Sequence, residues 1–242
     1  MTISVRATGT YLSGTANLTP AIPAGATSGD MMLCVYGTKP YSDAPTINNG
    51  WTSLGSATDG TVAAGVDSGS MQTRIFYKEH TGTESNPTVT NTTNNSSTAL
   101  IIVFQRTEAG WAAMVGAGGG DNTAGTAFSV TMSSDVGHAA GDMVVGGAAF
   151  RSDAAVPTNG NGMTIAGTTL GAYVWPAAHA STSGGDMGMT IGHIPVNSGT
   201  STGAPVFSCN LAAAHTGSAF FARLREVASF VFNNTLPLMG AG

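Results

Sequence analysis

Charged residues are scarce in this sequence. Eight Lys or Arg and 13 Asp or Glu make up 9% of the 242 residues, against about 25% in an average globular chain. The basic residues form no cluster, and the formal net charge is −5. A nucleic-acid binder needs a basic surface that displaces counterions, so we expect no direct binding to DNA or RNA. A surface of hydroxyls, amides and small apolar groups supplies little repulsion between copies, which favours permanent assembly.

Long apolar runs are also lacking. No stretch approaches 18 consecutive apolar residues, and residues 1–6 lack a basic segment followed by an apolar one. We therefore expect neither a membrane protein nor a secreted one. There are only two cysteines, Cys34 and Cys209, and they form no metal-spaced pair. Two buried free thiols in a reducing cytoplasm are the main interpretation, and a disulfide that links the two halves of the chain is the alternative.

Recognisable motifs for catalysis, metal ions or cofactors are missing as well. The five histidines show no i, i+4 or H-E-x-x-H spacing. Residues 199–203 match the G-x-S-x-G pattern of hydrolases, but there a polar loop leads into a strand rather than into a helix. Residues 116–121, GAGGGD, lack the Lys-Ser/Thr of a phosphate loop and are expected to form a flexible connector. Since no carboxylate pair suited to sugar hydrolysis is evident, we predict no enzymatic activity, no metal and no cofactor.

What the sequence does contain is a series of short signposts that occurs twice in the same order. The matched segments are 29–31 with 141–143, 50–52 with 162–164, 69–71 with 185–187, 87–89 with 205–207, and 98–100 with 218–220. The displacement is 112 positions for the first two pairs and then grows to 116, 118 and 120. Insertions into loops rather than strands produce such a drift, so the pattern predicts an internal duplication. Because 34 glycines make single matches common, the prediction of a duplication depends on the order and spacing of the matches and not on any one of them.

The predicted fold is all-β, with two tandem antiparallel β-sandwich domains of jelly-roll or immunoglobulin-like type. The first repeat is placed at residues 1–110 and the second at 111–228, followed by an apolar tail at 229–242. Each repeat is long enough to bury its own core. Eight segments rich in β-branched, aromatic or Met residues are predicted strands: residues 3–8, 31–36, 71–78, 99–105, 128–132, 143–150, 187–194 and 219–224.

Three of these regions allow finer expectations. In residues 71–78 the alternation places Gln72 and Arg74 on a wetter face than Ile75. Residues 100–104 are apolar throughout, which indicates a strand covered on both faces or at a subunit contact. Residues 210–227 contain helix-forming alanines but are kept as strand, because Gly217 interrupts them. Long loops are expected at 55–69, 82–97, 116–125, 153–162 and 197–203.

Aromatic and apolar residues supply the candidate interface. An extended backbone would point Tyr173 and Trp175 the same way, as a platform for a sugar, as an anchor for a protein contact, or as a cap on the core of the second repeat. Trp51 is expected to plug the core of the first repeat. The tail carries five large apolar side chains that are costly to leave in water, so it covers a core edge or reaches another subunit. These side chains are Phe230, Phe232, Leu236, Leu238 and Met239.

The first repeat resembles virion proteins of tailed bacteriophages. The resemblance rests on GDMMLCVY at residues 29–36, GWTSLG at 50–55 and IFYK at 75–78, the order in which those proteins open a β-sandwich module. The second repeat keeps the pattern in degenerate form, with Met163 where the pattern has Trp. The resemblance implies a structural component of the particle and carries over no catalytic residue.

We therefore expect a virion protein, made in the bacterial cytoplasm, that decorates or stabilises the capsid as a homo-oligomer. A trimer is expected by analogy with proteins at three-fold positions, and the expected partners are other copies and a major capsid or tail protein. The alternative is a tail-associated adhesin that binds a host receptor or surface glycan through its Thr/Asn/Ser loops and the Tyr173/Trp175 pair.

Overall fold

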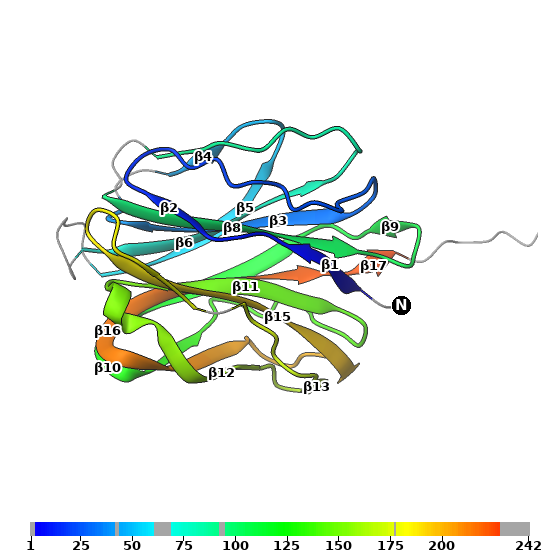
Figure 1. Ribbon diagram of the computed structural model, residues 1–242. Coiled ribbons are helices and arrows are strands. Elements are labelled where there is room, and N and C mark those ends of the chain that lie inside the picture. The colour runs from blue at the N-terminus through cyan, green and yellow to red at the C-terminus, as the bar shows by residue number, and fades with distance from the viewer. Residues whose placement is uncertain (1–2, 42–43, 61–68, 92–94, 177, 228–242) are drawn as a thin grey trace, which may run out of the picture.

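The computed structural model describes residues 3–41, 44–60, 69–91, 95–176 and 178–227 (Figure 1). These residues form antiparallel β-sheets, and among them there is no α-helix and one 3₁₀ turn, Asp153–Ala155. Within the described ranges, no helix is long and apolar enough to cross a membrane. The all-β expectation is therefore confirmed. Two large sheets hold most of the strands and lie face to face (Figure 1).

The first sheet is built from residues 4–105 and has six strands. Its order is β1-β8-β3-β6-β5, with β2 also paired to β8. The strand bounds are β1 Ser4–Thr8, β2 Leu12–Gly14, β3 Met31–Lys39, β5 Thr52–Asp59, β6 Met71–Glu79 and β8 Ser96–Gln105. A two-stranded ribbon of β4, Thr46–Ile47, and β7, Val89–Thr90, lies over the outer side of this sheet (Figure 1).

The second sheet is built from residues 115–224 and has seven strands. Its order is β10-β16-β11-β15-β13, with β12 paired to β16 and β14 paired to β15. The bounds are β10 Val115–Thr131, β11 Met143–Phe150, β12 Pro157–Thr164, β13 Thr168–Leu170, β14 His179–Ser181, β15 Met187–Gly199 and β16 Val206–Leu224. The short strands β9, Gly110–Trp111, and β17, Glu226–Val227, pair where the chain crosses between the sheets and where the described chain stops.

Equivalent strands of the two sheets pair in the same register. Met31 of β3 lies opposite Phe104 and Glu79 in the first sheet, and Met143 of β11 lies opposite Leu224 and Pro195 in the second. These partners are displaced by 112, 120 and 116 positions, which are the offsets of the sequence signposts. The spacing of the signposts thus anticipated the strand register in both sheets.

The turn before each of these strands is also built alike. The Asp30 carboxylate accepts a hydrogen bond from the Thr27 amide at 2.8 Å, and the Asp142 carboxylate accepts one from the Ala139 amide at 2.8 Å. Each aspartate pairs with an arginine, Asp30 with Arg6 at 2.6 Å and Asp142 with Arg225 at 2.7 Å. The Gly-Asp signposts therefore start the central strand of each sheet, as turn formers do.

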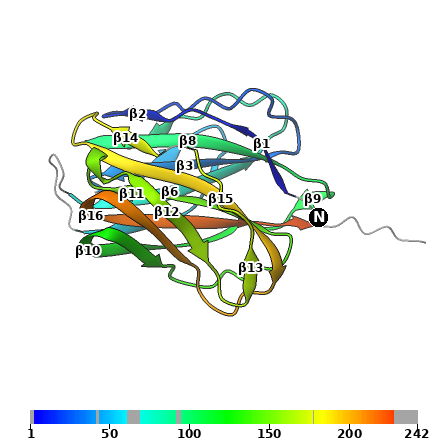
Figure 2. The ribbon, with the colours of Figure 1, turned by 60° about the horizontal axis from the view of Figure 1, so that its bottom comes forward.

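The apolar residues fill three layers. An inner core lies between the sheets and includes Leu33, Leu100 and Phe104 from the first sheet, with Ile191 and Phe220 from the second. Two outer cores cover the remaining faces, one beneath β4 and β7 and the other beneath β12 and the curled parts of β10 and β16 (Figures 1 and 2). Each half thus has an outer core of its own, but the halves also share the inner core instead of standing apart as separate beads.

The inner core also contains a polar contact between the sheets. The Thr73 hydroxyl of β6 donates to the Ser218 carbonyl of β16 at 2.8 Å and lies 2.9 Å from the Ser218 hydroxyl. All three groups are buried, and a buried polar group without a partner would cost free energy. Because hydrogen bonds are directional and apolar contacts are not, this contact helps to fix the lateral position of one sheet on the other.

All eight predicted strands occur, several of them longer than predicted. Leu100, Ile102 and Phe104 face the inner core while Ile101 and Val103 face an outer core. Of the two alternatives predicted for this segment, β8 is therefore the strand covered on both faces. Residues 210–224 are strand rather than helix. In β6 the alternation is correct, but its wetter face is largely covered too, since Gln72 and Phe76 are buried. Trp51 lies in the outer core of the first sheet, and both cysteines are buried free thiols.

The glycine-rich segment 116–125 is not a connector, and this prediction was wrong. It lies inside β10, which pairs with β16 and lies against β5. A Cβ atom at Gly118 would lie 2.6 Å from Ala57, and one at Gly120 would lie 2.2 Å from the Thr58 carbonyl oxygen. The glycines are there because only a strand without side chains fits this close to its neighbours.

Three other predicted loops, at 55–69, 153–162 and 197–203, are partly strand in the described residues. Polar, glycine-rich stretches continue as strand where a neighbouring strand accepts their hydrogen bonds. Thus β5 runs to Asp59, β12 covers residues 157–164, and β15 extends to Gly199. Composition alone marked these stretches as turns, while backbone pairing with distant strands decides their conformation.

Candidate functional site

The most chemically varied depression lies on the outer side of the first sheet, and we call it the Arg74 pocket. It has a volume of about 310 Å³ and opens between β4, β5 and β6. Its lining combines an aromatic pair, a cation, two hydroxyls and small apolar residues. These residues are Ala44, Pro45, Thr46, Ile47, Trp51, Ser53, Arg74 and Phe76.

Neutral oxygen atoms hold the Arg74 guanidinium in place. Nη1 donates to the Ser53 hydroxyl at 2.8 Å, Nη2 to the Ser56 hydroxyl at 3.3 Å, and Nε to the Gln72 side-chain oxygen at 3.4 Å. The guanidinium carbon lies 5.9 Å from the centre of the Phe76 ring. Burial lowers the pKa of Arg74, but an arginine stays charged at neutral pH. The pocket therefore presents one positive charge, while the rings of Trp51 and Phe76 beneath it are buried.

Trp51 lines one side of this pocket but belongs mainly to the core. Its ring is 7% exposed and packs in the outer core with Met32 and Phe76. Its Nε1 atom is buried and has no hydrogen-bond partner, which is uncommon for a buried donor and destabilising.

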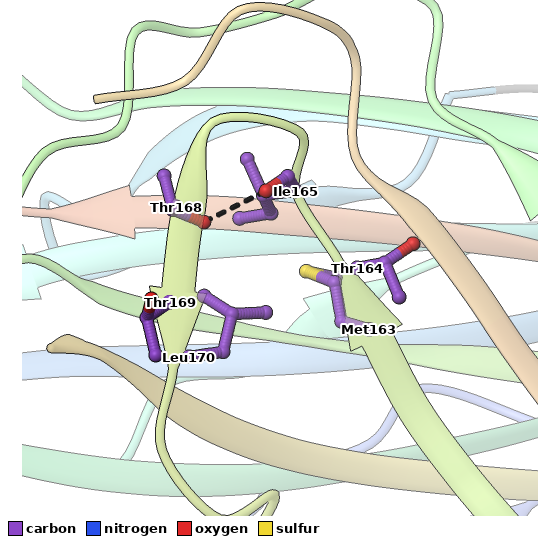
Figure 3. A pocket seen from close by; sticks show the side chains of 6 residues that line it. All are labelled: Met163, Thr164, Ile165, Thr168, Thr169 and Leu170. Atoms are coloured by element: carbon purple, nitrogen blue, oxygen red, sulfur yellow. Dashed lines mark hydrogen bonds between the residues drawn. The ribbon is translucent and has the colours of Figure 1, made fainter. Parts of the chain in front are cut away.

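A second depression of about 320 Å³ lies between β12 and β13 (Figure 3). Met163, Ile165 and Leu170 give it apolar walls, while Thr164, Thr168 and Thr169 add hydroxyls. The Thr168 hydroxyl donates to the Ile165 carbonyl at 2.8 Å, which closes the turn that joins the two strands (Figure 3). No titratable side chain lines this depression in the described structure, so its residues offer packing and hydrogen bonds but no acid–base chemistry.

A buried charged cluster joins the two sheets at one end of the molecule. Asp59 is 2% exposed and accepts a hydrogen bond from the Met71 amide at 2.6 Å, and its other oxygen lies 3.5 Å from Arg151 Nε. Lys39 is fully buried and donates to the Arg151 carbonyl at 2.5 Å. Burial raises the pKa of Asp59, against the opposing effect of Arg151. The groups engage one another, which suits a structural role in holding β3, β5 and β11 together.

A serine and a histidine that are far apart in the sequence meet at the edges of the two sheets. The Ser13 hydroxyl of β2 lies 2.6 Å from His179 Nε2 of β14, and the Tyr11 ring stacks on the imidazole at 4.7 Å. Burial lowers the pKa of His179. No carboxylate hydrogen-bonds this imidazole in the part of the chain that is described, so the pair lacks the third member that orients a catalytic histidine. We interpret it as a clamp between the sheets, which the separation of 166 positions hid from sequence reasoning.

The other histidines and the G-x-S-x-G segment also have structural surroundings. Ser201 donates its hydroxyl to the Asp135 carboxylate at 2.7 Å, whereas the serine of the hydrolase motif donates to a histidine. The His138 ring lies 3.8 Å from the same carboxylate. Within the described residues there is no group of three or more His, Cys, Asp or Glu side chains placed to hold a metal ion.

Of the candidate interface residues, the structure describes Tyr173 and Trp175. Tyr173 packs against the outer core of the second sheet, with its ring 6.1 Å from that of Phe207, and Val174 between it and Trp175 bridges to His193. Of the three roles considered, Tyr173 therefore performs that of core cap, while Trp175 is half-buried. Phe230, Phe232, Leu236, Leu238 and Met239 lie outside the described residues.

Reasoning from the sequence did not predict the Arg74 pocket, although it had identified some of the residues that line it. Trp51 was recognised as a core residue and Arg74 as lying on the wetter face of β6, but nothing in the spacing indicated that residues 44–47 would meet them.

No family model, no curated protein and no solved structure matches this chain.

Proposed function

We propose that this chain is a non-enzymatic structural protein of a tailed-phage virion, which decorates or stabilises the particle as a homo-oligomer, with a trimer as the expected state. The observation that carries the proposal is the apolar sequence that follows the last described strand. The last described strand ends at Val227, which is 41% exposed, and residues 229–242 with their five large apolar side chains follow it. Such a segment gains most by burial against a partner.

Other features support the same function. The body is stiffly cross-connected by the inner core and the Thr73–Ser218 contact. Sparse charge lowers the repulsion between neighbouring copies, and many copies add avidity to modest contacts. The resemblance of residues 29–78 to phage virion proteins is the reason for proposing a phage particle as the place of assembly. In this proposal the partners are other copies and a major capsid or tail protein, and the location is the virion.

The proposal includes an origin for the fold. Two tandem sandwich modules of jelly-roll or immunoglobulin-like type, each a main sheet with its outer cover, descend from one ancestral module by duplication. The matching register at Met31 and Met143 and the matching turns at Asp30 and Asp142 support this origin.

Assembly is tested with the full-length protein by sedimentation at micromolar concentration. We expect the wild type to be oligomeric and the double variant Phe230→Ser, Phe232→Ser to be mainly monomeric with an unchanged melting temperature. The control Asn233→Ser, a polar change in the same segment, should remain oligomeric. A monomeric wild type that also fails to bind phage heads and tails would overturn the proposal, and electron microscopy of labelled particles distinguishes the capsid from the tail.

A second candidate function is a tail-associated adhesin for a host-surface glycan. Tyr173 no longer supports it, because that ring is used in the core. The Arg74 pocket favours it instead, since one guanidinium and the hydroxyls of Thr46 and Ser53 offer hydrogen bonds to a polar ligand such as a sugar. Location at the tail tip would favour this function over decoration.

A further inference from the structure

The side of the molecule where β2 meets β14 is built from uncharged sequence. The two stretches that supply it, residues 7–29 and 154–185, contain no Asp, Glu, Lys or Arg. The Ser13 hydroxyl of β2 lies 2.6 Å from His179 Nε2 of β14, so the two stretches lie side by side (Figure 2). We call residues 11–14, 172–176 and 178–181 the β2/β14 edge.

Large apolar side chains are exposed on this edge. In the described part of the chain three such side chains are exposed, Leu12 at 38%, Val174 at 51% and Val227 at 41%. Leu12 belongs to β2, and Val174 bridges to His193 of β15 in the segment that leads into β14. The half-buried Trp175 follows Val174. Two of the three exposed side chains thus lie on the β2/β14 edge, and the third is the last described residue before the tail.

Both strands of this edge have a free side. In the described sheets β2 pairs with β8 and β14 pairs with β15, each on one side only. Proteins commonly protect such edge strands from other chains with charged side chains or with a covering segment. Because the β2/β14 edge has no charged residue of its own, a covering segment is the remaining protection.

The tail has the chemistry and the length to be that segment. Residues 228–242 contain no Asp, Glu, Lys or Arg but five large apolar side chains. Contact between an uncharged tail and an uncharged edge removes apolar surface from water without desolvating a charge. An extended segment of this length reaches about 50 Å, far enough to cross from Val227 to another molecule.

We propose that the β2/β14 edge is the docking surface for the tail, residues 229–239, of a second copy of this chain. The apolar side chains of the tail pack on Leu12, Val174 and Trp175. This inference rests on the proposed assembly through the tail and adds the surface that receives it. Since the tail and the edge are different patches of one chain, the contact is heterologous, and heterologous contacts that close form rings such as a trimer.

The variant Val174→Asp tests the edge in the full-length protein by sedimentation. The tail would have to desolvate the new carboxylate, so self-association should weaken at least tenfold, while the melting temperature stays unchanged because position 174 is exposed. Thr131→Asp is the matched control and should assemble as the wild type does. It adds the same charge at an exposed position of β10, which lies at the opposite end of the strand order of the second sheet.

The outcomes separate the docking surface from the assembly itself. If Val174→Asp assembles normally while the double variant Phe230→Ser, Phe232→Ser is monomeric, the tail docks elsewhere. The present inference then fails and the assembly proposal stands. An equal loss of assembly in Thr131→Asp also contradicts the assignment of this edge. A monomeric wild type overturns both proposals.

Cross-linking identifies which chain supplies the tail. Full-length Ser229→Cys and Ala172→Cys proteins, given different affinity tags, are mixed and treated with a short thiol cross-linker, while the native Cys34 and Cys209 are buried. We expect a link between the two tagged chains, and none when Thr131→Cys replaces Ala172→Cys. If instead only the variant that carries both cysteines in one chain becomes linked, within a single chain, the tail covers its own edge and the proposal is wrong.

Discussion

Individual polar residues in this protein act mainly by closing turns and pairing across elements. Asp30 and Asp142 close equivalent turns, and Ser13 with His179 joins the edges of the two sheets. Glu84 closes the turn after β6. It accepts hydrogen bonds from the Thr81 amide and hydroxyl at 2.8 and 2.6 Å, and its second oxygen lies 3.2 Å from His80 Nε2. Desolvation raises the pKa of Glu84, but the bonds from Thr81 outweigh it and hold the pKa at about 2.

Glu84 should make part of the stability depend on acid pH. Its folded pKa of about 2 is below the usual value of about 4.3 for an unfolded chain. The stabilisation is therefore complete above about pH 4.3 and is lost as pH falls towards 2. We expect Glu84→Gln to cost about 1 kcal/mol at pH 7, since solvent screens this turn, and nothing at pH 2. Urea unfolding at both values measures this, and an equal cost at both would exclude the charge as the cause.

At the scale of elements, the sequence predicted which segments are strands but not how far they extend. Apolar and β-branched residues identified β3, β8 and β11 directly. The glycine-rich half of β10 and the polar end of β15 were missed, because pairing with β16 and β13 decides their conformation and leaves no local pattern. The Arg74 pocket was missed for a related reason, since it forms where β4 meets β5 and β6.

The close approach of β10 to β5 gives an element-level prediction. Gly120→Ala places a Cβ atom 2.2 Å from the Thr58 carbonyl oxygen, so the strands must separate, and we expect a loss of about 2–3 kcal/mol. Gly110→Ala in β9 is the matched control, because a Cβ atom there meets nothing within 4 Å. It should be neutral or slightly stabilising. Thermal unfolding of both variants measures the difference, and similar stabilities would show that β10 is not held against β5.

At the scale of the whole molecule, the main feature is that both halves bury their central sheets in one inner core. Leu33 and Ile191 belong to different sheets but to this same layer, and both are fully buried. Without the other sheet, the apolar inner face of either sheet would be exposed to water. The two-fold pattern in the sequence predicted two tandem β-sandwich domains, but it carried no information on whether they would stand apart or pack together.

This arrangement predicts that the protein unfolds as one unit. Calorimetry should show a single unfolding transition. Leu33→Ala and Ile191→Ala should each shift this transition to lower temperature, because the cavity that each leaves reduces the free energy of unfolding by about 2–5 kcal/mol. Two separate transitions, each sensitive to only one of the substitutions, would mean that the halves fold independently. Thr200→Ala, at an exposed position, serves as a control with little expected effect on stability.

The β9–β17 ribbon has a practical consequence. It brings the final described strand to the end of the molecule where β1 begins (Figure 1). The two ends of the described chain, before β1 and after β17, therefore lie at one pole, and the 3₁₀ turn with the edges of β2 and β14 lies at the opposite pole (Figures 1 and 2). Two fluorophores attached beside β1 and β17 would thus mark the same pole of the protein and leave the other for whatever surface it meets.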